Sequence, residues 1–149
     1  KAVYAGKEKQ HLDLFYHIDH IGEETKAEID VKGALSDESK KIFRGTLDFK
    51  RGCSGSVGDE GDYAIQLDPK TKNISLPLLL CTEDNVQGNH ASSAGQLDAN
   101  TIYFLMSRGF SLEEARRIVV EALIRPIIDE MDESIREEVL SAVREKLDK

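Results

Sequence analysis

One histidine in this chain stands among unusually small residues. The stretch GNHASSAGQLD, residues 88–98, surrounds His90 with glycine, alanine and serine and comes just before a helical pattern begins. Histidine carries protons and binds metals near neutral pH. Two interpretations stay open: a tight strand-to-helix connection with a hydrogen-bonded histidine, or a histidine held open at a subunit junction for a metal centre. One histidine cannot complete the ligand set of a metal centre, so the second interpretation needs ligands from another chain.

Three further histidines lie close together near the start of the chain. In a strand, His11 and His17 share one face, whereas His20 points to the opposite face. Only a turn between them would gather all three around a metal.

The two cysteines are too few for a four-thiolate site or a disulfide framework. Cys81 ends an apolar run and is expected in the core of a strand, where a thiol is inert. Cys53 lies in the Gly/Ser-rich stretch RGCSGSVG and is expected to be exposed. Neither is expected to bind a metal, and reduced thiols favour a cytoplasmic protein.

Several function classes are disfavoured by the sequence. The glycines of GCSGSVG, residues 52–58, are followed by neither Lys-Ser/Thr nor a helix start, so they predict no phosphate loop and no nucleotide on this chain. No Ser–His–Asp or paired-carboxylate arrangement can be placed. The net charge of −8 argues against nucleic acids and anionic membrane surfaces as partners. No apolar run approaches the ~20 residues of a membrane-spanning helix.

The elements that position these residues change character near Asp98. Before it, short runs alternate apolar and polar residues, which is typical of strands. The gaps are predicted to be polar turns, among them SDESKK (36–41), GCSGSVGDEGD (52–62) and DPKTKN (68–73). Many short strands without helical crossovers fit a sandwich, a barrel or a β-solenoid, and periodicity does not choose among them.

After Asp98 the pattern predicts three helices. Asp98 caps a short first helix that ends at Gly109, and Ser111 opens a second helix with Glu114 completing a capping box. The second helix is apolar on more than one side, needs cover from two directions, and is kinked or ended by Pro126. A third helix carries apolar residues spaced by four: Ile135, Val139, Val143 and Leu147.

Three stretches resemble the SufB/SufD family of the SUF iron–sulfur assembly system. They are HIGEET (20–25), FRGTLDF (43–49) and GNHASSAGQLDANTIYFLMSRGFSLEEARRIV (88–119), which occur in the family's order. His20 begins the first stretch, where the resemblance implies a turn and a structural hydrogen bond of this histidine. The resemblance implies a mainly β fold: a right-handed parallel β-helix (β-solenoid) core over residues 1–97, followed by a C-terminal helical, ATPase-binding segment over residues 98–149. Because the chain begins at Lys1 and family members carry a further N-terminal region, we expect a core truncated on that side.

The resemblance also implies a role and partners. Family members are non-enzymatic scaffolds on which a transient Fe–S cluster is built at a subunit interface. They dimerise through the ends of their β-helices, here with a SufB/SufD-type chain or with a second copy, and their helical ends bind a SufC-type ATPase. His90 is then the candidate metal ligand, with further ligands from the partner chain.

The family pattern is not fully kept around this histidine. SufD chains often read CSHGATVGQLD where this chain reads GNHASSAGQLD, so Gly88 replaces a cysteine. SufB chains carry a cluster-ligating cysteine six residues before a shared proline, which matches Pro77 and puts Thr71 at the cysteine position. Acidic residues that flank the SufB histidine are Asn89 and Ala91 here. The departures favour a SufD-like chain.

Two rival functions stay open at this point. Some solenoid acyltransferases use a histidine base near a C-terminal helix, but their hexapeptide period is absent here. A purely architectural subunit would bind the ATPase and touch no cluster, and the sequence does not separate it from a cluster-binding scaffold.

Overall fold

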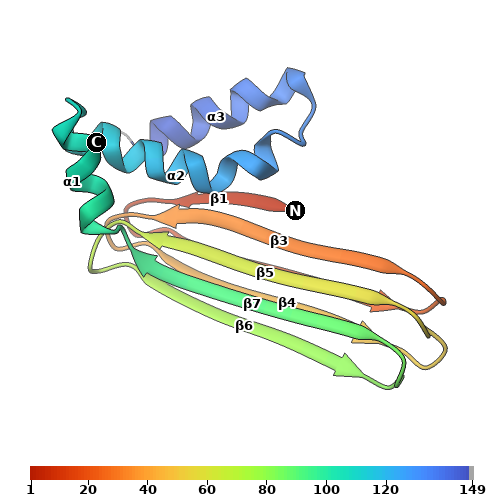
Figure 1. Cartoon of the computed structure of the whole chain (residues 1–149). Coiled ribbons are helices and arrows are strands. Elements are labelled where there is room, and N and C mark those ends of the chain that lie inside the picture. Colours follow the sequence, from red (N-terminus) through yellow and green to blue (C-terminus); the bar gives the residue numbers. More distant parts are fainter. Residues whose placement is uncertain (148–149) are drawn as a thin grey trace.

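Parallel strands coil into a solenoid of about three turns in the computed structural model, which describes residues 1–147 (Figure 1). One sheet has the order β1–β3–β5–β7, made of Ala2–Gly6, Lys26–Leu35, Val57–Gln66 and Gln87–Gln96. The facing sheet has the order β2–β4–β6, made of His11–His20, Lys40–Phe49 and Lys72–Cys81. The expected β-solenoid is confirmed.

The core lies between the two sheets because alternate residues of each strand point inward. Along β2, Leu12 to Ile18 alternate with more exposed neighbours, as the period-two pattern predicts. Residues from both sheets form one buried apolar cluster: Tyr4, Ile29, Val31, Leu35, Phe43, Leu47, Phe49, Cys53 and Ala64.

The three helices follow β7, and the first two begin at the predicted caps. Helix α1 (Ala99–Ser107) is capped by the Asp98 carboxylate, which accepts from the Thr101 N–H at 2.8 Å. Helix α2 (Leu112–Ile128) has the predicted capping box between Ser111 and Glu114. Pro126 does not end α2, which continues to Ile128 before α3 (Glu133–Leu147) begins.

Helices α2 and α3 lie beside β1, at the opposite side of the strand stack from β6 and β7 (Figure 1). Ile124, Ile128, Leu140 and Val143 form a second buried cluster, against which Val3 of β1 packs. Helix α2 therefore receives the predicted cover from two directions, from the strands and from the other helices. On α3, Val143 is buried as its spacing suggests, whereas Ile135 is exposed. None of the helices in residues 1–147 is long and apolar enough to cross a membrane.

Three segments predicted as turns or connections are strands. Strand β4 begins at Lys40, β5 begins at Val57, and β7 spans most of the small-residue stretch around His90. Their composition carries little strand signal. They are extended because a neighbouring parallel strand supplies backbone partners, as when Gln87 N–H donates to Ser56 O at 2.9 Å.

The two cysteines have the opposite environments from those predicted. Cys53 is fully buried in the apolar cluster, because the turn between β4 and β5 folds its side chain over the core. Cys81 is exposed at the end of β6, where no further strand covers it, and its thiol donates to Glu83 O at 2.9 Å. Both are free thiols.

Candidate functional site at the open end of the solenoid

The two ends of the strand stack differ in what covers them. The covered end consists of β1 with α2 and α3 packed against it. The open end consists of β6 and β7, each the last strand of its sheet. Every residue of β7 is exposed.

His90 lies in the middle of β7, in register with Glu60 of β5. Its neighbour two residues back, Gly88, faces the interior: a Cβ built there would lie 3.0 Å from Phe49 Cε2 and 3.5 Å from Leu79 Cδ1. Because side chains alternate along a strand, His90 belongs to the same inward row. It is nevertheless exposed, since no strand lies over the open end.

Beneath His90, the Glu60 carboxyl group is buried without a hydrogen-bond partner. The residue is 3% exposed, and neither Oε1 nor Oε2 has a partner. Its space comes from Gly45 on the opposite sheet, where a Cβ would lie 1.7 Å from Glu60 Oε1. Burial, and then the nearby Asp62 carboxylate, raise the pKa of Glu60 to about 7.

An ion pair lies next to Glu60 inside the solenoid. Lys41 of β4 is 0% exposed and its Nζ pairs with Asp62 Oδ1. The ammonium group also lies 5.0 Å from the Tyr4 ring centroid and 5.7 Å from that of Phe43. Burial lowers the pKa of Lys41, and the bond to Asp62 opposes that shift. Burial, and then the Asp62 charge, raise the pKa of Tyr4.

The interior becomes more polar from the covered end to the open end. One inward row reads Ile29, Glu60, His90 across β3, β5 and β7, and the next row reads Val31, Asp62, Ser92. On the opposite sheet, Asn73 Oδ1 and Ser75 Oγ of β6 are also buried without partners. The residues that sequence reasoning missed, Lys41, Glu60 and Asp62, all lie in stretches predicted as turns. The period-two spacing of Gly58, Glu60, Asp62 and Ala64 was the signal that could have found the last two.

Comparisons with known proteins identify the family. A family model described as "SUF system FeS cluster assembly, SufBD core domain" matches residues 1–123. The chain belongs to the SufBD core family. It is 30% identical over 148 residues to the iron–sulfur cluster assembly protein SufD of Bacillus subtilis, which covers 99% of this chain and 34% of that protein. It is 28% identical over 127 residues to SufB of the same organism, covering 85% of this chain and 27% of SufB.

An iron–sulfur cluster assembly SufBD family protein of Staphylococcus saprophyticus is 27% identical over 129 residues, covering 87% of this chain and 28% of that protein. The chain thus spans only 27–34% of the length of these relatives. The family recognised from the three motifs is confirmed, and a SufD-like chain agrees with the higher identity to SufD.

Elsewhere in this SufBD chain, His20 has the structural role expected of it. It is buried, its Nδ1 lies 2.6 Å from Thr25 Oγ1, and its ring stacks on Phe49 with centroids 4.5 Å apart. Burial lowers the pKa of this imidazole. His11 and His17 point outward on the opposite face of β2, as the alternation predicts.

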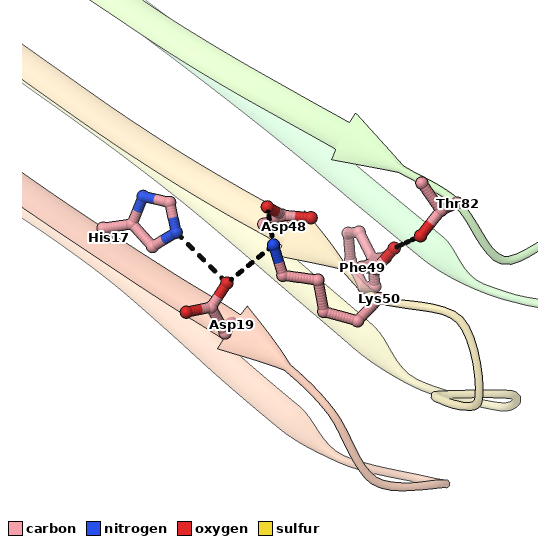
Figure 2. A network of polar contacts seen from close by, with 6 residues as sticks. All are labelled: His17, Asp19, Asp48, Phe49, Lys50 and Thr82. Carbon is pink, nitrogen blue, oxygen red and sulfur yellow. Dashed lines mark hydrogen bonds and ion pairs between the residues drawn. The ribbon is translucent and has the colours of Figure 1, made fainter.

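One group of possible metal ligands lies on the outer face of the β2–β4–β6 sheet (Figure 2). Ligand atoms of His17, Asp19 and Asp48 lie within 4.8 Å of one another, the only such group of three within residues 1–147. Figure 2 shows the Lys50 ammonium between the two carboxylates, with Nζ 3.2 Å from Asp19 Oδ1 and paired with Asp48. The Lys50 ammonium group already bridges these two carboxylates, so the group does not require a metal.

The two positions at which the family resemblance predicts cysteines hold no thiol here. Thr71 lies in the turn before β6, and its hydroxyl donates to Asp68 O at 2.8 Å. Gly88 packs its backbone against Phe49. Neither residue can supply a thiolate ligand beside His90.

Proposed function

We propose that this chain is a non-enzymatic, SufD-like scaffold subunit in SUF iron–sulfur cluster assembly, with His90 as its ligand to the nascent cluster. The observation that carries the proposal is that His90 lies at the centre of an uncovered strand in a chain of the SufBD family. The cluster is the cargo of the assembly. The ATPase partner would supply the nucleotide chemistry.

This chain can supply only part of the cluster's ligand set. Fe–S clusters are held mainly by cysteine thiolates, and histidine replaces them only in some positions. Within the described residues, His90 has no neighbouring pair of ligand groups, and Cys81 ends a strand of the other sheet. A second scaffold chain, of SufB/SufD type or a second copy, would therefore bring the thiolates to His90.

The free edge of β7 suits such a partner better than the free edge of β6. Gln87 N–H donates to β5, so by alternation Gly88, His90, Ser92 and Ala94 direct their backbone N–H groups to the free edge. On β6, Lys72 and Thr82 donate to the β4 side, so Pro77 occupies a position that faces the free edge. Proline has no N–H to offer there. A partner strand would therefore pair with β7, because no proline interrupts the backbone N–H groups along its free edge.

The edge hypothesis is tested by placing proline on one edge at a time. Ser92→Pro removes an edge-facing N–H of β7 without touching its ladder to β5, and should abolish dimerisation at tens of micromolar in sedimentation. Cys81→Pro makes the matched change on β6 and should leave a dimer with an interface above roughly 1,000 Å². A Ser92→Pro chain that still dimerises, or a wild-type chain that stays monomeric, would contradict the proposed pairing.

Helix α1 is the surface we assign to the SufC-type ATPase. The helix has no buried residue, although most of its side chains are apolar, and Tyr103 and Phe104 are 75% and 55% exposed. A run of exposed aromatic side chains on one short helix is typical of a protein interface. Tyr103→Ser combined with Phe104→Ser should abolish co-purification of the ATPase. Ile135→Ser, at an exposed position of α3, is the control and should leave it intact.

The ligand role is tested with His90→Asn in the complex of both scaffold chains and the ATPase. The variant should fold, bind the ATPase and lose cluster in anaerobic reconstitution, measured by Fe–S absorbance and by iron and sulfide content. His17→Asn, an exposed histidine on the outer face of β2, should keep the wild-type cluster. Wild-type cluster content in His90→Asn would instead make this chain a purely architectural subunit.

A further inference from the structure

We infer that Glu60 is a positioning residue for His90: its carboxylate accepts a hydrogen bond from one ring nitrogen and leaves the other nitrogen for iron. The inference rests on the proposed role of His90 as a ligand. It assigns a use to a side chain for which the fold has made space and left no hydrogen-bond donor.

The first step is that Glu60 lacks a donor where it lies. A buried carboxyl group without a hydrogen bond is costly, so its retention calls for a partner. The adjacent ammonium group of Lys41 is bonded to Asp62. Gly45, which faces Glu60, has no side chain, and Pro77, in register with Gly45 on β6, has no N–H.

The second step is that His90 is the next side chain in the same inward row. On the other side of Glu60 that row holds Ile29, which is apolar. Adjacent strands lie ~4.8 Å apart, so an imidazole turned inward from β7 reaches a carboxylate on β5 at hydrogen-bonding distance. The bond is not made in the structure, where the His90 ring is exposed at the open end.

The third step is that the ring has room to turn inward. Its neighbours in the inward row along β7 are Gly88 and Ser92, both small. A partner strand on the edge of β7 would cover the ring from the outside. The same pairing that completes the ligand set would therefore bring His90 over Glu60.

The chemistry of a histidine ligand needs such a carboxylate. A metal-binding histidine usually donates its second ring N–H to a carboxylate or carbonyl, which fixes the tautomer, orients the ring and makes the ligating nitrogen more basic. Glu60 would do this from within the solenoid, out of contact with the cluster itself.

The test compares Glu60→Gln with Asp59→Asn in the iron-free two-chain scaffold. Asp59 is the neighbouring acidic residue on β5, and its carboxylate lies on the outer face, where it accepts from Asn89 at 2.9 Å. With ¹⁵N-histidine labelling, Glu60→Gln should move the His90 ring signals toward the tautomer mixture of a free imidazole, and weaken Co²⁺ binding by roughly 10–100-fold. Asp59→Asn should change neither.

Other results of these measurements would contradict the inference or the proposed function. Unchanged His90 ring signals in Glu60→Gln would overturn the inference, whether Co²⁺ binding weakens or not, because a loss of affinity alone would mark a purely structural role. Thermal unfolding checks that the variant folds, which we expect because the change removes a buried carboxyl group. If His90→Asn keeps the cluster, the proposed ligand role fails. The ring signals of the wild type and of Glu60→Gln still show whether His90 and Glu60 form the hydrogen bond.

Discussion

The covered end and the open end of the solenoid share one backbone register but differ in their side chains. At the covered end, inward residues such as Ile29 and Val31 are apolar, and α2 and α3 add a second apolar cluster. At the open end, the same rows hold charged and polar groups, and leucines such as Leu76 and Leu78 of β6 stay exposed. The covered end buries its apolar side chains, and the open end leaves polar groups and apolar surface uncovered.

The largest effect on the free energy of unfolding is expected from the buried ion pair between Lys41 and Asp62. Lys41→Met removes the cation and leaves Asp62 buried without its partner, which should lower the free energy of unfolding by about 3–5 kcal/mol. Lys41→Met combined with Asp62→Leu should restore most of that loss, because the pair is replaced by apolar groups. Urea unfolding of the three proteins measures both. A double variant no more stable than Lys41→Met would show that the ion pair itself is needed.

The second-largest effect comes from replacing leucine by alanine at each end, because the two losses of stability should differ. Leu140→Ala, in the cluster between the helices and β1, should cost about 2–5 kcal/mol, since it removes a fully buried side chain and leaves a cavity. Leu76→Ala, on the outer face of β6 where the residue is 53% exposed, should stay within about 0.5 kcal/mol. Equal losses in chemical denaturation would refute the division between the ends.

Glu60, on β5 next to the open end, gives the stability a pH dependence. Its pKa is raised to about 7 in the folded chain from the ordinary value of 4.5, so the folded state binds the proton more tightly than the unfolded state. Stability from this group should therefore fall as pH rises from about 4.5 through 7, by up to about 3 kcal/mol. Glu60→Gln should remove this slope in unfolding measured across that range. An unchanged slope would assign the dependence to other groups.

The smallest effect is expected from an ion pair outside the solenoid. Arg44 and Asp13 bond at 2.6 Å on the outer face of the β2–β4–β6 sheet, and both are about half exposed. Because water and salt screen such a pair, Arg44→Gln should change stability by only about 0–1 kcal/mol. A loss near that of Lys41→Met would mean that burial does not set the strength of these pairs.

Much of the fold could be predicted from the sequence, and the candidate site only in part. The inward side chains of β2 follow from period two, the helix starts from Asp98 and Ser111, and the solenoid from family motifs. The polar interior was not predicted, because Lys41, Glu60 and Asp62 are residue types that seldom enter a core and lie in stretches predicted as turns, although the period-two spacing marks Glu60 and Asp62. Strand β7 was not predicted because its small residues are extended by pairing with β5, and no local sequence pattern indicates that pairing.

The parallel register also sets how this chain can fold. Each strand pairs only with strands one turn away, as Ala2 pairs with Val31 and Val57 with Gln87. No hydrogen bond of the sheets joins the first turn to the last, so structure can spread turn by turn from a nucleus, as in other repeat architectures. The helices that pack on β1 are made last in chain order, yet Lys146 donates to Ala5 O at 3.1 Å. Amide exchange should therefore slow progressively from β7 through β5 to β3. The packing of α2 and α3 on β1 should form only after these helices have been synthesised.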